Sequence, residues 1–91
     1  MNKQIGNVPV GMLVRSKAGH DKDCIYAIIR KEGTTVYVAN GDTRSLKHPK
    51  RKNPKHLQVI NCVADIEKMN DVQLKRHIKQ YLEEEECQKQ M

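Results

Sequence analysis

The residues most able to do chemistry in this sequence are two groups of cations. Residues 47–56 read KHPKRKNPKH, with five Lys or Arg, two His and no acid. Residues 15–22 read RSKAGHDK, in which small residues around Gly19 let backbone N–H groups approach a ligand. Cationic side chains and free N–H groups are suited to binding phosphate. Simpler interpretations stand beside this one: the first segment as a solvated charged surface, the second as an ordinary polar loop.

Other kinds of chemistry are not indicated. The sequence contains no obvious pair of carboxylates, no nucleophile beside a base and no glycine-rich nucleotide loop, so we expect no enzyme activity and no cofactor. Its four His and three Cys lack the spacing of a zinc site, and no C-x-x-C occurs. Unpaired cysteines favour a reducing, cytoplasmic location. Cys24 stands in an apolar segment and is expected to be a small core residue.

The charge of the chain is large and uneven. The 91 residues carry a formal net charge of +6, and 37% of them are hydrophobic, which suits one small folded domain. Residues 1–60 hold 12 Lys and Arg against 4 Asp and Glu, whereas residues 61–91 hold 5 against 7. A basic body favours a polyanionic partner. No apolar run approaches the roughly 20 residues needed to span a bilayer, and we expect no membrane association.

The cations must be positioned by short strands. Apolar patterns predict one strand that begins at Val10 and four more strands that cover residues 24–30, 35–39, 43–46 and 57–60. Asn40-Gly41 predicts a type I′ hairpin turn before the fourth strand. Pro49 and Pro54 predict that the basic stretch is a stiff, extended loop between the fourth and fifth strands. Five short strands with tight turns predict a small barrel or rolled sheet.

The C-terminal part changes to a helical period. Apolar residues recur there at Leu74, Ile78, Tyr81 and Leu82. Asn70 and Gln73 have the spacing of a capping box, and Met69 stands where a hydrophobic staple contacts Leu74. The predicted organisation is a flexible N-terminus at 1–7, a barrel at 8–61, a connector and helix at 62–86, and a disordered tail at 87–91.

Two stretches carry a resemblance to a known family. VGMLVRSKAGHDKDCIYAII resembles a KOW motif, in which a strand, a loop around a glycine and a second apolar strand follow one another. VYVANGDTRSLKHPKRKNPKHLQ resembles the downstream half of small bacterial KOW-domain RNA-binding proteins, which are related to the eukaryotic- and archaeal-type large-subunit ribosomal protein family fourteen-e. The likeness covers about residues 9–60. Many members have glycine after the DK of the loop, where this sequence has Asp23.

The resemblance implies a mainly β fold, an SH3-like (KOW) barrel of about five strands with a C-terminal α-helix. It also implies a ribosomal or ribosome-associated protein that binds ribosomal RNA, with ribosomal proteins as further partners; we expect it to be a monomer when free. An SH3-like protein-interaction module, as an adaptor of the ribosome or the transcription machinery, is the alternative. The residues expected to contact RNA are the polar and cationic members of the two loops: Arg15, Ser16, Lys17, Gly19, His20, Lys22, Arg44, Lys47, His48, Lys50, Arg51, Lys52, Lys55 and His56.

Overall fold

The fold is mainly β with one long C-terminal helix, as predicted. The computed structural model describes residues 8–89, so the predicted flexible N-terminus at 1–7 and the end of the predicted tail at 90–91 lie outside it. The strands are β1 (Met12–Ser16), β2 (Ile25–Glu32), β3 (Thr35–Ala39), β4 (Lys50–Lys52) and β5 (Leu57–Val63). Two single 3₁₀ turns, η2 (Pro54–His56) and η3 (Ile66–Lys68), precede and follow β5, and α1 (Asp71–Lys89) ends the described chain.

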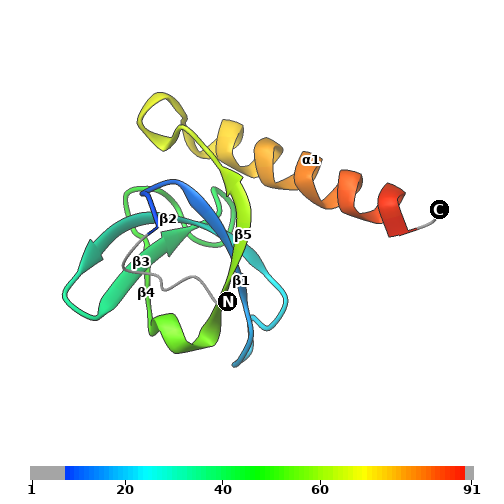
Figure 1. The fold of residues 1–91 in the computed structure, drawn as a ribbon. Helices are drawn as coiled ribbons and strands as arrows, with labels where there is room; N and C mark the ends of the chain where they lie inside the picture. Colours follow the sequence, from blue (N-terminus) through cyan, green and yellow to red (C-terminus); the bar gives the residue numbers. More distant parts are fainter. Residues whose placement is uncertain (1–7, 90–91) are drawn as a thin grey trace.

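All five strands belong to one antiparallel sheet. Their order is β4-β3-β2-β1-β5, and the sheet curls so that its two edge strands are joined through η2 (Figure 1). The register shifts between Met12 and Val14 on β1 and between Ile28 and Arg30 on β2. Bulges of this kind increase the local bend and twist of a strand. A sheet of short strands can therefore wrap around a core of its own.

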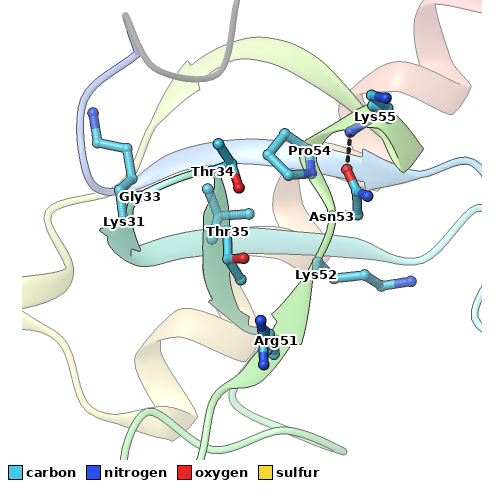
Figure 2. A pocket seen from close by; sticks show the side chains of 10 residues that line it. Lys31, Gly33, Thr34, Thr35, Arg51, Lys52, Asn53, Pro54 and Lys55 are labelled. Carbon is cyan, nitrogen blue, oxygen red and sulfur yellow. Dashed lines mark hydrogen bonds between the residues drawn. The ribbon is translucent and has the colours of Figure 1, made fainter.

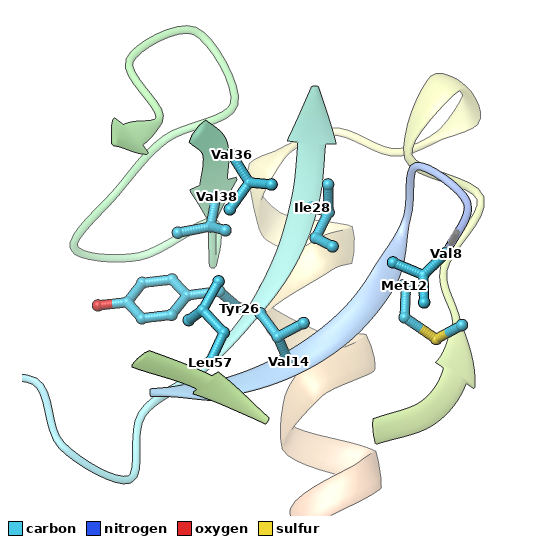
Figure 3. Close-up of a cluster of buried hydrophobic side chains, with 8 residues drawn as sticks. All are labelled: Val8, Met12, Val14, Tyr26, Ile28, Val36, Val38 and Leu57. Carbon is cyan, nitrogen blue, oxygen red and sulfur yellow. The ribbon is translucent and has the colours of Figure 1, made fainter. Parts of the chain in front are cut away.

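One face of the curled sheet encloses the first apolar cluster. Side chains alternate along a strand, so every second residue of β1, β2 and β3 points to this face. Figure 3 shows these side chains directed toward one another from the separate strands. The buried members are Val8, Met12, Val14, Tyr26, Ile28, Val36, Val38 and Leu57. Burial of these side chains is what drives the sheet to close on itself.

The opposite face of the sheet is covered by α1. Leu74 and Ile78, which are 0% and 7% exposed, pack in a second cluster with residues of β1, β2 and β3. Ala27 and Ala39 belong to this cluster, and their small side chains let the helix lie close to the sheet. The apolar face predicted for residues 74–82 is therefore largely used within the chain, since Tyr81 also packs against this cluster and only Leu82 of the four predicted residues is exposed.

The start of α1 has the predicted cap. The backbone N–H of Gln73 donates to Oδ1 of Asn70 at 2.9 Å, and the N–H of Asn70 donates to Oε1 of Gln73 at 2.9 Å. Met69 and Leu74 lie in the same apolar cluster, as a staple requires. The helix continues three residues beyond the predicted boundary at 86. Likewise, β5 extends past the predicted barrel boundary to Val63.

The prediction of a strand at residues 43–46 is wrong, and so is the type I′ turn at Asn40-Gly41. Oδ1 of Asn40 accepts hydrogen bonds from the N–H groups of Asp42 and Arg44 at 2.9 and 3.0 Å, which closes a compact local turn. The same loop packs on the start of α1, where the N–H of Leu46 donates to Oδ1 of Asp71 at 2.7 Å. Gly41 has φ +77°, and a Cβ there would collide with the backbone of Asp71. Packing against the helix thus replaces pairing in the sheet.

The prediction that Cys24 is a core residue is also wrong. Its side chain is exposed, because β2 begins one residue later, at Ile25, and Cys24 belongs to the preceding loop. No described helix is both long enough and apolar enough to cross a bilayer.

Candidate nucleic-acid interface

The two basic segments lie side by side. The loop 17–24 leaves β1, while η2 leads into β5, and β1 and β5 are paired through Ser16 and Leu57. The backbone N–H of Lys17 donates to the carbonyl of His56 at 2.7 Å. Pairing of the two strands therefore brings together cations that are about 40 residues apart in the sequence.

Asp21 joins the two segments through its carboxylate. Its Oδ2 accepts hydrogen bonds from Nζ of Lys50 at 3.1 Å and from Oη of Tyr26 at 2.8 Å. Its Oδ1 accepts from Nζ of Lys52 at 2.9 Å and from Oγ of Ser16 at 3.1 Å. We call these five residues the Asp21 cluster. The side chains of Asp21 and Lys52 are only 12% and 11% exposed.

The cluster is held in its charged form. Burial opposes ionisation of Asp21, but hydrogen bonds from Lys52, Tyr26, Lys50 and Ser16 outweigh it and keep the pKa of this carboxyl well below its usual range. Burial and the hydrogen bond to the carboxylate raise the pKa of the Tyr26 phenol. The cluster is therefore an internal ion network with its donors and acceptors matched. Among the described side chains, no buried nitrogen or oxygen lacks a hydrogen-bond partner.

The Asp21 cluster corrects the interpretation of the basic stretch. The segment has no acid of its own, and its two prolines predict an extended loop. Instead, residues 50–52 form strand β4. Because side chains alternate along a strand, Lys50 and Lys52 point to Asp21, while Arg51 points to the opposite face. The one acid that pairs with both lysines comes from the other loop, and the three charges together leave a net charge of +1.

Arg15 and Ser16 also have partners inside the protein. Nη2 of Arg15 lies 2.9 and 2.8 Å from the two carboxylate oxygens of Glu85 on α1, and both side chains are 22% exposed. Ser16 is fully buried within the Asp21 cluster. Four of the predicted RNA-contacting residues, Arg15, Ser16, Lys50 and Lys52, thus have internal contacts that hold the sheet, the loops and the helix together.

The other predicted cations and histidines are exposed. They lie on the loop 17–24, on the loop before β4, on β4 itself and on η2, and none forms an ion pair with another described residue. These residues are Lys17, His20, Lys22, Arg44, Lys47, His48, Arg51, Lys55 and His56. Gly19 is exposed as well and has φ +87°. We call these exposed residues of the loop 17–24 and the segment 44–56 the rim, and they are the ones left available for an anion.

Asp23 adopts a backbone conformation that favours glycine. Its φ is +73°, and no other described residue except glycine has a positive φ. This is the position at which many of the similar KOW proteins have glycine. Aspartate tolerates the left-handed region better than most residues, so the loop keeps its course without the glycine. The Asp23 carboxylate is exposed and takes no part in the Asp21 cluster.

A groove opens beside this rim, between the β2–β3 turn and the segment formed by β4 and η2. Its volume is about 960 Å³, and Figure 2 shows Thr34 and Thr35 facing Pro54 and Arg51 across it. Asn53 also lines the groove, and its Oδ1 accepts a hydrogen bond from the N–H of Lys55 at 2.9 Å. Sequence reasoning did not assign the β2–β3 turn to the site, because the turn carries no motif and meets β4 only in the folded sheet.

Metal binding has no support in the described part of the chain, where no three His, Cys, Asp or Glu side chains gather. Cys62 and His77 come near each other, with Sγ 4.0 Å from Nε2, but no third such residue joins them. Comparison of the sequence with protein-family models gives no match, and comparison with curated proteins gives none either.

Proposed function

We propose that this protein is a non-enzymatic RNA-binding protein of the cytoplasm that associates with the ribosome and contacts phosphates of folded RNA. The observation that carries the proposal is the exposed cationic rim on the two adjoining loops. Because the Asp21 cluster ties the loops together, the rim cations sit on a rigid base and little loop entropy is lost on binding. The resemblance to KOW proteins supports RNA rather than another polyanion.

The choice of folded RNA follows from the aromatic residues. Of the three tyrosines, Tyr26 is buried and Tyr81 packs in the cluster under α1, so the surface offers few rings on which a single strand could stack. Cations on rigid loops fit the phosphate backbone of a folded RNA better. The alternative, a protein-interaction module, could use the apolar face of α1 to bind a partner only if that face were uncovered. It loses support because Leu74 and Ile78 on this face are buried against the sheet.

The test removes rim cations that form no ion pair with another described residue. In the variant Lys17→Ala/Lys55→Ala, we expect weaker binding to folded large-subunit ribosomal RNA in a filter-binding titration. The log–log slope of affinity against salt should fall by about 1.4 to 1.8, since each neutralised phosphate contributes about 0.7 to 0.9. The matched control is Arg76→Ala/Lys79→Ala, which removes two exposed cations from α1. Equal losses in both variants would show that net charge, not the rim, governs binding.

A further inference from the structure

A row of three side chains crosses the sheet at β2, β3 and β4. Tyr37 on β3 is directly opposite Arg30 on β2 and directly opposite Arg51 on β4. Residues opposite one another in antiparallel strands place their side chains on the same face. The row therefore sets one aromatic ring between two guanidinium groups on the surface of the sheet.

The ring and one of these groups are already stacked. The guanidinium carbon of Arg30 lies 4.2 Å from the centroid of the Tyr37 ring. Nη2 of Arg30 also lies 3.2 Å from Oε2 of Glu32. Both side chains are 59% exposed, and an ion pair this exposed holds an arginine only weakly. Tyr37 is half-buried and, unlike the other two tyrosines, belongs to neither apolar cluster of the described residues.

The row continues into the groove of Figure 2. Arg51 and Thr35 flank Tyr37 and also line the groove, whose lining includes the rim cation Lys55 as well as Lys52, which is paired with Asp21. No acid is among the described residues that line it. A ligand that covers both features must combine a flat ring, for the stacked pair, with a negative charge, for the groove.

We propose that Arg30 and Tyr37 form a stacking site for one unpaired nucleobase, whose adjoining phosphate is held by Arg51 at the mouth of the groove. The proposal rests on the RNA-binding function proposed above and adds a base contact to the phosphate contacts of the loops. Guanidinium planes and tyrosine rings are the side-chain surfaces on which RNA bases stack. Two arginines beside the ring disfavour a cationic ligand such as a methylated lysine, which needs a cage of aromatics.

The size of the site limits what it can bind. One half-buried ring and one stacked guanidinium accommodate a single base, and not a run of them. The site thus suits a nucleotide that is bulged or flipped from a folded RNA, next to helical phosphates that meet the rim. This assignment agrees with the packing of the other two tyrosines, Tyr26 and Tyr81, in the apolar clusters.

The test compares two polyanions of similar length, oligoadenylate and inorganic polyphosphate, of which only the first has bases. We expect Tyr37→Ala to weaken binding of oligoadenylate about tenfold, the effect of losing one stacked base. Its binding of polyphosphate should stay unchanged. Tyr37→Phe keeps a ring of the same shape and should bind both as the wild type does. Equal losses for both polyanions in Tyr37→Ala, or no loss for either, would overturn the proposal.

Arg30→Lys guards against a folding defect at Tyr37. This variant keeps the charge at an exposed position but removes the planar guanidinium. It should therefore weaken the binding of oligoadenylate several-fold and leave the binding of polyphosphate unchanged. No effect of Arg30→Lys on oligoadenylate would count against the stacked pair. If the wild-type protein binds no RNA at all, the proposed function fails and this site fails with it. If the wild type binds RNA but Tyr37→Ala and Arg30→Lys bind oligoadenylate equally well, only the stacking site is refuted.

Discussion

Replacement of Asp21 by Asn tests whether the Asp21 cluster holds the two basic segments together. Asn keeps the size of the side chain but removes its charge and turns one acceptor oxygen into an NH₂ donor. Each carboxylate oxygen now accepts one lysine Nζ and one hydroxyl. A hydroxyl can rotate to accept a bond from the new donor, whereas an ammonium group cannot. One lysine is therefore left facing a donor, whichever way the amide is oriented.

The size of the effect follows from burial. Lys52 is 11% exposed, so loss of its counter-charge leaves an ammonium group that water barely reaches. Removal of one partner from a buried ion pair costs about 3 to 5 kcal/mol. A domain of this size is stable by about 5 to 15 kcal/mol. We therefore expect Asp21→Asn to lose a large part of the free energy of unfolding at neutral pH.

The loss must depend on pH in one direction. The pKa of Asp21 is depressed in the folded state below its ordinary value of 3.8, so the folded state binds fewer protons than the unfolded state in that range. The stabilisation from Asp21 is complete above the unfolded pKa and is lost as the pH falls toward the folded pKa. The difference in stability between wild type and Asp21→Asn should thus be constant near neutrality and should shrink below about pH 4.

Urea unfolding followed by circular dichroism measures both quantities, and Asp23→Asn is the matched control. Asp23 lies two residues away and carries the same charge, but it is exposed and outside the cluster. A loss in Asp21→Asn no larger than the loss in Asp23→Asn would refute the role of the cluster. The role of the cluster would also be refuted if the free energies of unfolding of wild type and Asp21→Asn differed by the same amount at neutral pH and at about pH 2.5, because such a difference could not come from an ionised carboxylate.

Three further predictions concern the loops and the helix. Asp23→Gly should raise the free energy of unfolding by about 0.5 to 1 kcal/mol, because glycine adopts φ +73° without strain and only part of this gain is offset by the larger entropy of the unfolded chain. Asp23→Ala is the control and should not raise the free energy of unfolding. Urea unfolding measures both variants. Gly41→Ala should lower the free energy of unfolding by about 2 to 4 kcal/mol, because the new Cβ meets the backbone of Asp71. Gly33→Ala places its Cβ in open space and should lower the free energy of unfolding by only about 1 kcal/mol. A double-mutant cycle of Arg15→Ala and Glu85→Ala should give a coupling of about 1 kcal/mol that weakens in high salt, and a coupling of zero would show that this pair does not hold α1 to the sheet.

Local patterns were sufficient for the elements that depend on neighbouring residues. The capping box of Asn70 and Gln73 closes within a single turn, so residue identity and spacing predict it fully. The strands β1, β2 and β3 follow from short apolar and β-branched runs, and side chains on both faces of these strands are buried. The apolar stripe at 74–82 likewise predicted α1, although the helix runs to Lys89, into the tail that was predicted to be disordered.

Local patterns failed where a distant partner decided the outcome. Asn40-Gly41 favours a hairpin in isolation, but the loop instead packs on the start of α1, which no local pattern reveals. The fourth strand is formed from Lys50, Arg51 and Lys52, which have little intrinsic tendency to form a strand. Pairing with β3 and the ion pairs with Asp21 stabilise it.

The sequence by itself therefore determined the class of the fold, the apolar faces and the excess of positive charge, because these depend on composition and on short periods. Only the tertiary structure decided which cations remain available to a partner. Charges interact through space, and Asp21 reaches two lysines about 30 residues away because the sheet folds its loop onto β4. The same folding leaves Lys17, Arg51 and Lys55 exposed and sets Tyr37 between two arginines.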